Sequence, residues 1–548
     1  MSLATIDLAI VFGYALFLIV IALLVSREKP GHKKDSTDYF LAGKALPWWA
    51  VGASLIAANI SAEQIIGQSG QGYVVGLAIA AYEWQAAIVL LITAKFFLPI
   101  FLKNNIYTMP QFLDLRFGGG VKSIMAVFWI VLYTAVNLTS VLWLGGLAIN
   151  AVTGLGVLPA MMALAAFAVV YSIYGGLKAV ALTDIIQVVV LIIGGVMITW
   201  IALALVGAGA GPVAGFNTLL GGIPDHFNMI LAPDHPNYSD LPGIWTLLGG
   251  LWVLHFSYWG FNQYIIQRAL GSKDLSEARK GLAFAAALKL LIPVIVVIPG
   301  IAALHLAQTG MLDQAALDAR PDSTYGVLMT LVPDGLRGLV FAALVAAIVS
   351  SLASMMNSIS TIFTMDLYRS VRSDKSESHY VTVGRITAFS AMVIALILAQ
   401  PFLGGMESAF QTIQEYTGFV APGVVGIFLL GFFWKRTNTP GAFALLLSSV
   451  GLSFIFWLMA NPAAAGGMGG GLLSTFGLEA LDMPFVVRIW IVFMACMVIG
   501  VAVSLLTAKP AETRPVDLSG IRFATEPIFN LASLAIIAIL IAIYGVFW

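Results

Sequence analysis

Charged side chains occur inside some of the most apolar stretches of this sequence. Glu83 lies in the run AYEWQAAIVLL, and Lys289 lies in AFAAALKLLIPVIVV. An ionisable group inside a membrane span costs roughly 2.5 to 3.5 kcal/mol on insertion scales, so each one is a candidate functional residue. Because Lys289 lies about ten residues into its stretch, it is too deep to snorkel easily and should face a carboxylate or a wet cavity. A hydroxyl-rich solute held between Glu83 and Lys289 would satisfy both charges.

Polar residues also crowd the second half of the apolar run VGASLIAANISAEQIIGQSGQGY. They are Asn59, Ser61, Glu63, Gln64, Gln68 and Ser69. This density fits a helix that is broken near mid-membrane, whose freed carbonyls coordinate a cation while its half-helix ends face a substrate. It fits equally well a tightly packed helix end with interhelical hydrogen bonds. The run alone leaves both interpretations open.

Three further runs combine polar and aromatic side chains. LHFSYWGFNQY contains His255, Tyr258, Trp259, Asn262 and Gln263, and another run begins with Phe410, Gln411, Gln414 and Glu415. A neutral imidazole on a helix face is usually structural, and aromatic clusters often only pack. VAAIVSSLASMMNS carries Ser350, Ser351 and Ser354, whose hydroxyls beside bare carbonyls would suit a monovalent cation better than calcium or magnesium. Serines in membrane helices are nevertheless more often packing residues.

The bulk composition assigns the chain to the membrane. Of 548 residues, 60% are hydrophobic and 10% are charged, and the mean hydropathy is +0.96. The net charge is zero, so the protein has no overall positive potential that would favour binding to nucleic acid. The sequence also implies no obligate protein partner. Cys496 is the single cysteine, which excludes an intrachain disulfide. No nucleophile elbow, P-loop or metal-spaced His/Cys set occurs, so we expect a protein that is not an enzyme and uses ion gradients rather than ATP.

About twenty apolar residues make one crossing, and on this basis we predict fourteen spans. They begin near residues 5, 47, 76, 121, 157, 178, 243, 280, 336, 380, 406, 439, 485 and 527. Lysine and arginine gather at alternate connections, among them those with Lys103 and Arg116, with Arg268 and Arg279, and with Arg514 and Arg522. By the positive-inside rule both termini are extracytoplasmic. The polar segments near 207–242 and 308–335 are predicted to be outer loops with room for short helices.

Several motifs resemble a known family. The run GGLKAVALTDIIQ resembles the signature of the sodium/solute symporter family, and GFFWKRTNTPGA resembles its second signature. DYFLAGK, SLIAANISAEQ, YWGFNQYIIQR, AAIVSSLAS and QEYTG place the chain in the sodium/glucose cotransporter branch, closest to its bacterial sodium/galactose cotransporters. The likeness covers nearly the whole chain, and its motifs are long.

The resemblance implies an all-α integral membrane fold with fourteen helices and a LeuT-type core of two inverted five-helix repeats. The division would be an extra N-terminal helix and cytoplasmic loop in 1–46, repeat one in 47–206, an extracellular loop in 207–242, repeat two in 243–436 and three peripheral helices in 437–548. Each repeat would begin with a broken helix, in spans two and seven. The location would be the bacterial inner membrane.

The resemblance also implies a set of site residues. Sodium, the co-transported ion, would be held by the carbonyls of Ala57, Ile60 and Ala347 and by the hydroxyls of Ser350 and Ser351. The monosaccharide would contact Gln64, Glu83, His255, Tyr258, Lys289 and Gln414. The gates would comprise Asn59, Gln68, Tyr82, Trp259 and Phe410, with Asn59 hydrogen-bonded to Tyr258. Asp184 resembles the acidic residue on the sodium exit route.

Departures from the family pattern fall on residues that are expected to surround the substrate. The galactose transporters have asparagine where this chain has His255, serine where it has Ala86, and methionine where it has Gln68. Ala353 replaces a hydroxyl of relatives that hold a second sodium, which favours one sodium per sugar.

A symporter for inositol, a sugar acid, an amino acid or a vitamin is the main alternative. A transporter-like sensor would need a signalling domain, and a passive channel fits an occluded polar site less well.

Overall fold

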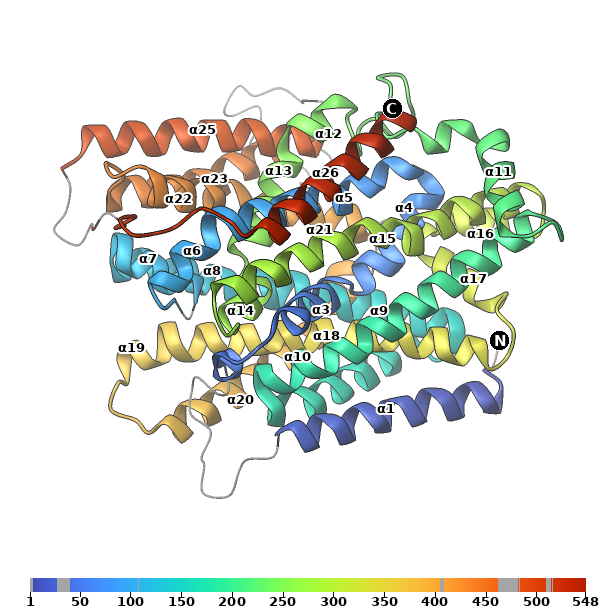
Figure 1. The fold of residues 1–548 in the computed structure, drawn as a ribbon, viewed down its shortest axis with the longest axis horizontal. Helices are drawn as coiled ribbons and strands as arrows, with labels where there is room; N and C mark the ends of the chain where they lie inside the picture. Colours follow the sequence, from blue (N-terminus) through green and yellow to red (C-terminus); the bar gives the residue numbers. More distant parts are fainter. Residues whose placement is uncertain are drawn as a thin grey trace.

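The computed structural model describes residues 3–26, 40–106, 108–404, 409–461, 481, 483–508, 514 and 516–548. Over these ranges the regular structure is helical, apart from one isolated bridge between Leu46 and Ser272. Figure 1 shows the helices packed side by side, with segments from both ends of the sequence covering the same bundle. Residues 27–39 of the cytoplasmic loop predicted within 1–46 lie outside the described residues.

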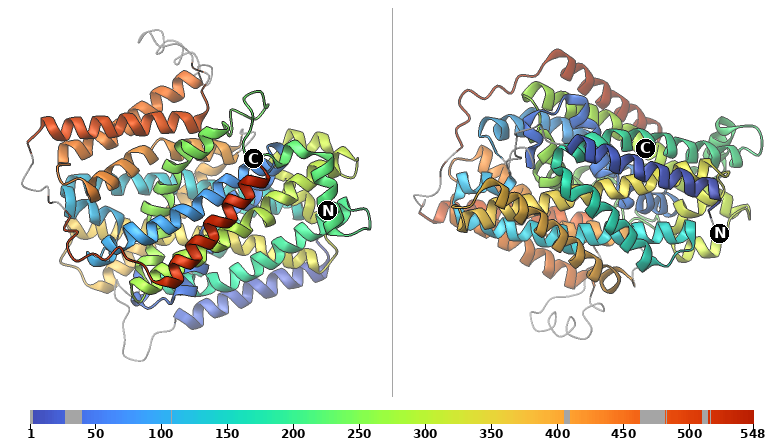
Figure 2. Two further views of the ribbon diagram at one scale, coloured as in Figure 1. Left: turned by 45° about the horizontal axis from the view of Figure 1, so that its top comes forward. Right: turned by 90° about the horizontal axis from the view of Figure 1, so that it is seen from below.

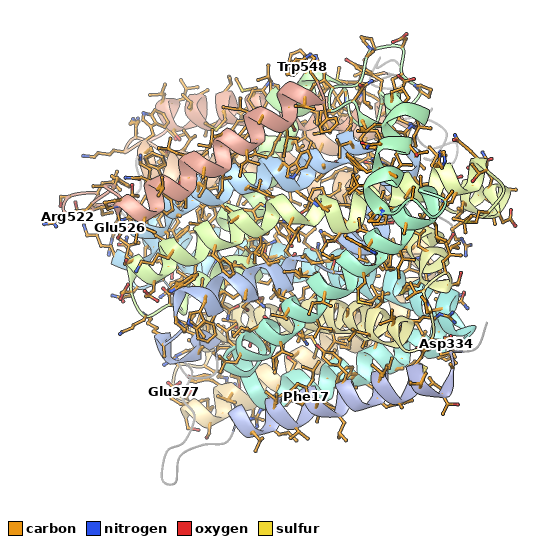
Figure 3. The ribbon with its side chains drawn as sticks, turned by 45° about the vertical axis from the view of Figure 1, so that its right-hand side comes forward. Phe17, Asp334, Glu377, Arg522, Glu526 and Trp548 are labelled. Carbon is orange, nitrogen blue, oxygen red and sulfur yellow. The ribbon has the colours of Figure 1, made fainter. Side chains whose placement is uncertain are left out.

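Ten helical stretches of the described chain are long and apolar enough to cross a membrane. They contain α1 (Thr5–Ser26), α5 (Ala81–Ile92), α8 (Gly119–Val131) with α9 (Thr139–Thr153), the second half of α10 (Val157–Val206), α15 (Leu275–Gln308), α18 (Leu336–Ile362), α20 (Glu377–Leu403), α23 (Thr439–Ala460), α25 (Phe485–Leu506) and α26 (Pro527–Val546). The outer surfaces of α1 and α26 carry exposed apolar side chains such as Phe17, which projects away from the bundle in Figure 3. Such surfaces are suited to lipid.

Two bent pairs raise the number of candidate spans in the described chain to twelve. In the first, α3 (Trp48–Asn59) is followed by the π-helical turn η2 (Glu63–Gly67) and α4 (Gln68–Val74), with a bend of 60°. In the second, α21 (Ala409–Gly418) and α22 (Ala421–Phe433) meet at 44°. The other two predicted spans fall on the short apolar stretch Val157–Val170 and on a series of short helices after residue 243. Because neither is long enough alone, the count of fourteen stays a prediction.

The helices in spans two and seven are both interrupted, as the sequence predicted. Ile60 leaves the helical conformation with ψ of 96° after α3. In span seven, α12 (Ile244–Leu248), α13 (Gly250–His255) and the π-helical turn η7 (Phe256–Gly260) precede α14 (Gln263–Leu270). Asn262 has ψ of 127°, and its side chain accepts a hydrogen bond from the Tyr264 amide to cap α14. Both interruptions are buried in protein, where non-helical backbone at membrane depth is tolerated.

The two ends of the described chain contact the two predicted outer loops. Asp7 accepts hydrogen bonds of 2.7 Å from the amides of Gly335 and Gly338, where α18 begins. The carbonyl of Phe547 accepts one of 2.6 Å from Met229, in the loop that also contains α11 (Pro212–Gly222). The views in Figure 2 show the marked termini on one side of the bundle. Both ends of the described chain therefore contact loops that were predicted to share one side of the membrane.

The segment before α26 contacts the opposite, basic end of the bundle. Its contacts are Arg514 N to Arg116 O at 3.0 Å, Lys103 to Asp517 at 3.5 Å and Arg279 to Glu526 at 3.9 Å. Figure 3 shows Arg522 and Glu526 at one end of the molecule and Asp334 at the other. The segment before α26 therefore joins basic residues of three predicted connections at one end of the molecule.

Candidate functional site

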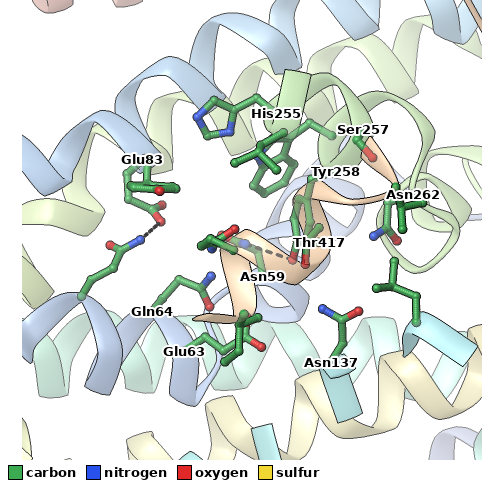
Figure 4. A pocket seen from close by; sticks show the side chains of 18 of the residues that line it. Asn59, Glu63, Gln64, Glu83, Asn137, His255, Ser257, Tyr258, Asn262 and Thr417 are labelled. Carbon is green, nitrogen blue, oxygen red and sulfur yellow. Dashed lines mark hydrogen bonds between the residues drawn. The ribbon is translucent and has the colours of Figure 1, made fainter. Parts of the chain in front are cut away.

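A cavity lined by polar and aromatic side chains lies among α3, η2, α5, η7, α15 and α21. All six residues predicted to contact the sugar line it: Gln64, Glu83, His255, Tyr258, Lys289 and Gln414. Four of the five predicted gate residues also line it: Asn59, Gln68, Tyr82 and Trp259. Figure 4 shows five of them, Asn59, Gln64, Glu83, His255 and Tyr258, converging from helices that are far apart in the sequence. The site is therefore built from both interrupted helices.

One side of the cavity is a buried ion pair. Lys289 donates to the carboxylate of Glu83 and to Oδ1 of Asn59, and the side chains of Lys289 and Glu83 are only 1% and 2% exposed. Gln68 donates to the other Glu83 oxygen at 2.7 Å, and the Lys289 ammonium lies 4.5 Å from the centre of the Trp259 ring. The sequence led us to expect a solute bridging Glu83 and Lys289, whereas here the two contact each other directly. Direct contact compensates two charges that would otherwise be costly to bury.

The break after α3 fixes the orientation of Gln64. Its Oε1 accepts hydrogen bonds from the Ser61 hydroxyl at 2.8 Å and from the Ser61 amide at 3.1 Å. With the carbonyl end held in this way, the amide nitrogen is the end left to face the cavity. Ser61 could adopt this position because its backbone lies outside the regular helix.

Tyr258 occupies the centre of the cavity wall. Its hydroxyl accepts hydrogen bonds from Asn59 at 3.1 Å and from the Tyr264 hydroxyl at 2.6 Å. Its ring contacts Trp259 at a centroid distance of 5.0 Å. Asn59 in turn accepts from Lys289, so one chain of hydrogen bonds runs from the Glu83 ion pair to the helix α14.

Phe410 does not line the cavity but packs behind Tyr82. The two rings meet edge to face at 5.3 Å, and Tyr82 also contacts the His255 ring at 6.4 Å. A Cβ atom added to Gly67 would lie 2.8 Å from the Cβ of Phe410. The missing side chain at Gly67 therefore permits this close approach of η2 to α21.

Several buried polar atoms that line the cavity have no hydrogen-bond partner within the described protein. They are Glu63 Oε1, Gln68 Oε1, Tyr82 OH, Asn137 Oδ1 and His255 Nε2. Buried polar groups are normally paired, so a cluster of such atoms around a cavity is typical of a ligand site. The sequence analysis left Glu63 without a role and missed Asn137. Asn137 could have been found because it is a polar residue within the apolar stretch Gly119–Thr153, and polar residues inside apolar stretches were the criterion used for the other spans.

The five predicted sodium ligands lie at the end of α3 and on α18, and all are buried. Ser351 donates to the carbonyl of Ala58 at 3.0 Å, next to the predicted ligand Ala57. Ser350 donates to Asp184 at 2.5 Å. No group of three or more His, Cys, Asp or Glu side chains in the described part of the chain could hold a metal ion. A cation in this region would depend on hydroxyl and carbonyl oxygens.

Asp184 belongs to a closed group that we call the Asp184–Arg268 network, comprising Ser54, Asp184, Arg268, Ser350 and Ser354. Asp184 accepts from Ser54 and Ser350, each at 2.5 Å, and lies 3.5 Å from Arg268. Arg268 also donates to Ser54 at 2.8 Å and to Ser354. The sequence analysis counted Arg268 among the basic residues of a connection, and the structure shows that its side chain is 1% exposed and turned inward to this pair. Arg116 and Arg279, assigned in the same way, are also buried.

A cavity with polar lining between interrupted helices, in a bundle of candidate membrane spans, is typical of a secondary transporter. The chain belongs to the sodium:solute symporter family, whose model matches residues 39–448. This is the family that the motifs indicated, and it is one of transporters rather than enzymes.

Relatives in this family cover most or all of the chain. A sodium/glucose cotransporter of Vibrio parahaemolyticus is 48% identical over 558 residues, covering 100% of this chain and 99% of the relative. A sodium/myo-inositol cotransporter 2 of Mus musculus is 35% identical over 489 residues, covering 82% of this chain and 69% of the relative.

Solved structures of two transporters share the fold. A Na⁺-coupled sialic acid symporter in a substrate-bound, outward-open state matches with a TM-score of 0.77 at 21% identity, over 92% of this chain and 99% of the other. A nucleobase-cation-symport-1 family transporter in a closed conformation matches with a TM-score of 0.52 at 16% identity, over 88% and 99%. At these identities the likeness concerns the fold alone.

Proposed function

We propose that this protein couples inward sodium movement to uptake of a glucose- or galactose-like monosaccharide by alternating access. The observation that carries the proposal is the cavity in which both interrupted helices bring Gln64, Glu83, Tyr258 and Lys289 together. A polyhydroxylated solute suits it, because each buried hydroxyl needs a partner and the cavity offers charged, amide and phenol groups. Full-length identity of 48% to a protein named a sodium/glucose cotransporter supports the same substrate class.

Sodium would bind at the end of α3, held by the carbonyls of Ala57, Ile60 and Ala347 and by the hydroxyls of Ser350 and Ser351. The hydrogen bond from Ser351 to Ala58 supports this site, because it brings α18 against the last turn of α3. Asp184 would receive the ion on its way to the cytoplasm, and one sodium would accompany each sugar. Movement down about 100 mV yields roughly 2.3 kcal/mol per ion, and a tenfold gradient adds about 1.4 kcal/mol. One ion would therefore support an accumulation of about a few hundred-fold.

The finer architecture is part of the proposal. Fourteen spans would include two inverted repeats, 47–206 and 243–436, with both termini outside the inner membrane of a bacterium. The interruption of the first helix in each repeat and the common face of the chain ends support this arrangement. Bundles would rock around the central cavity, with Tyr82 and Phe410 as the outer gate and Tyr258 as the inner one.

The direct test is sodium-driven uptake of labelled hexoses into proteoliposomes. We expect Ser351→Ala or Gln64→Ala to abolish uptake, since the first removes a sodium ligand and the second a sugar ligand. Ser533→Ala is a matched control. The Ser533 hydroxyl donates to the carbonyl of Phe529 in the same helix, α26, and this helix does not line the cavity. Normal uptake by both site variants would refute the proposal, provided that thermal unfolding shows all three variants to be folded.

Transport of a different solute is the alternative. The 35% identity to proteins named sodium/myo-inositol cotransporter supports inositol, which also presents a ring of hydroxyls. Competition by inositol, sugar acids, amino acids and vitamins against labelled galactose distinguishes these cases. Inhibition by inositol at lower concentrations than by any hexose would favour the alternative.

A further inference from the structure

The unpartnered atoms around the cavity are mainly hydrogen-bond acceptors. Gln68 Oε1 and Asn137 Oδ1 can only accept, Glu63 Oε1 accepts when the carboxyl group is ionised, and the Tyr82 hydroxyl can both donate and accept. His255 uses one ring nitrogen in a hydrogen bond with the backbone of Ala81, which leaves Nε2 as an acceptor. A ligand that satisfies this set must be rich in donors.

The cavity also carries unequal charge. Its lining contains two carboxylates, Glu63 and Glu83, and one ammonium group, that of Lys289. Lys289 is committed to Glu83, whereas no ion pair with Glu63 occurs in the described chain. Glu63 is nevertheless only 7% exposed. A buried carboxyl group without a cation is costly to ionise, so a ligand that brings positive charge would stabilise its ionised form and be bound by it.

Glu63 and Asn137 belong to the same side of the cavity. Figure 4 shows both below Asn59, with His255 and Glu83 on the other side. Glu63 begins η2, next to the predicted sugar ligand Gln64, and Asn137 lies in the π-helical turn η5 (Leu132–Leu138). Glu63 and Asn137 line the same cavity as Gln64, Glu83 and Lys289, so a solute held by Gln64 lies in the cavity that presents this carboxyl group and amide oxygen.

We propose that protonated amino sugars are substrates of this transporter, with the ammonium group held by Glu63 and Asn137. An ammonium group supplies three donors and no acceptor, matching the free oxygens on that side. It also neutralises the excess carboxylate. The inference rests on the proposed sugar transport and specifies which sugars the site prefers.

Equilibrium binding to the purified full-length protein in sodium tests this proposal, with three ligands of the same ring configuration. They are the parent hexose, its 2-amino-2-deoxy derivative at about pH 6, where the amine is protonated, and the neutral N-acetyl derivative. We expect the amino sugar to bind at least about tenfold more tightly than the hexose, since a charged hydrogen bond contributes about 1.5 to 3 kcal/mol. The N-acetyl derivative should show no such preference, because it lacks the charge.

The ratio of amino sugar to hexose affinity is then compared between variants. Glu63→Gln keeps the shape and removes the charge, so the ratio should fall to about one. Asn137→Asp adds a second carboxylate on the same side of the cavity as Glu63, so the ratio should rise. If Glu63→Gln fails to fold, this variant tests whether charge on that side sets the preference for the amino sugar. Equal affinities in the unmodified protein, or a preference that survives in Glu63→Gln, would overturn the inference. If instead no hexose is carried in the proteoliposome assay, the proposed function fails, whatever this ratio is.

Discussion

Two buried polar clusters lie close together in this molecule and differ in how completely they are paired. The cavity presents unpartnered atoms of Glu63, Gln68, Tyr82, Asn137 and His255. In the Asp184–Arg268 network, hydrogen bonds and an ion pair connect side chains from α3, α10, α14 and α18. The first cluster leaves atoms that a ligand would have to pair, whereas the second is satisfied by the protein itself.

This difference predicts that the two clusters contribute differently to ligand affinity and to the stability of the fold. A buried atom that has no partner in the free protein contributes to affinity when the ligand supplies one, and its removal costs the fold little. A buried charge whose partner is removed leaves an uncompensated charge and destabilises the fold strongly. Substitutions in the cavity should therefore change affinity more than stability, and substitutions in the Asp184–Arg268 network should do the reverse.

The largest expected effect is that of Arg268→Met. The variant leaves Asp184 buried with two hydroxyl donors and no cation, which should lower the free energy of unfolding by about 3 to 5 kcal/mol. Thermal or denaturant unfolding of the purified protein in detergent measures this. The double variant Asp184→Asn with Arg268→Met removes both charges and should recover most of the loss. A single variant as stable as the unmodified protein would show that the ion pair does not hold these helices together.

The fold was predictable from the sequence where one physical rule dominated. Apolar length identified the long helices, and the family resemblance implied both interruptions, since polar crowding around Asn59 alone fits a packed helix end equally well. Length does not decide the other two predicted spans, because they fall on the short helices after residue 243 and on α10, which runs from Val157 to Val206. Counting charges placed Arg268 near a basic connection but could not show that its side chain turns inward to pair with Asp184.

The site was predictable as a set of residues more than as a set of contacts. The motifs named the side chains that line the cavity, but no pattern revealed that Glu83 and Lys289 would bind each other directly. Such pairing depends on the relative placement of α5 and α15, which the sequence does not encode locally. Glu63 was visible in its motif but went unassigned, because its significance depends on the absence of a counter-charge in three dimensions.

Tyr82→Phe has the next largest expected effect, and it changes affinity alone. The Tyr82 hydroxyl is buried without a partner, so its removal should change the free energy of unfolding by less than about 0.5 kcal/mol. If a sugar hydroxyl bonds to it, hexose affinity should fall by about tenfold. Equilibrium binding and thermal unfolding of one preparation give both values. Lost stability with unchanged affinity would reverse the distinction between the two clusters.

Tyr264→Phe makes the same chemical change where the two clusters meet, and its effect should be the smallest. The Tyr264 hydroxyl donates to Tyr258 at the cavity, and its backbone carbonyl accepts from Arg268. Loss of one buried hydrogen bond should destabilise the protein by about 1 kcal/mol. Hexose affinity measured with and without sodium gives the coupling between the ligands, which should weaken by about threefold as Tyr258 loses its link to α14. Unchanged coupling would mean that sodium and sugar communicate through α3 instead. There Ala58, whose carbonyl accepts from Ser351, is followed directly by Asn59, which donates to Tyr258.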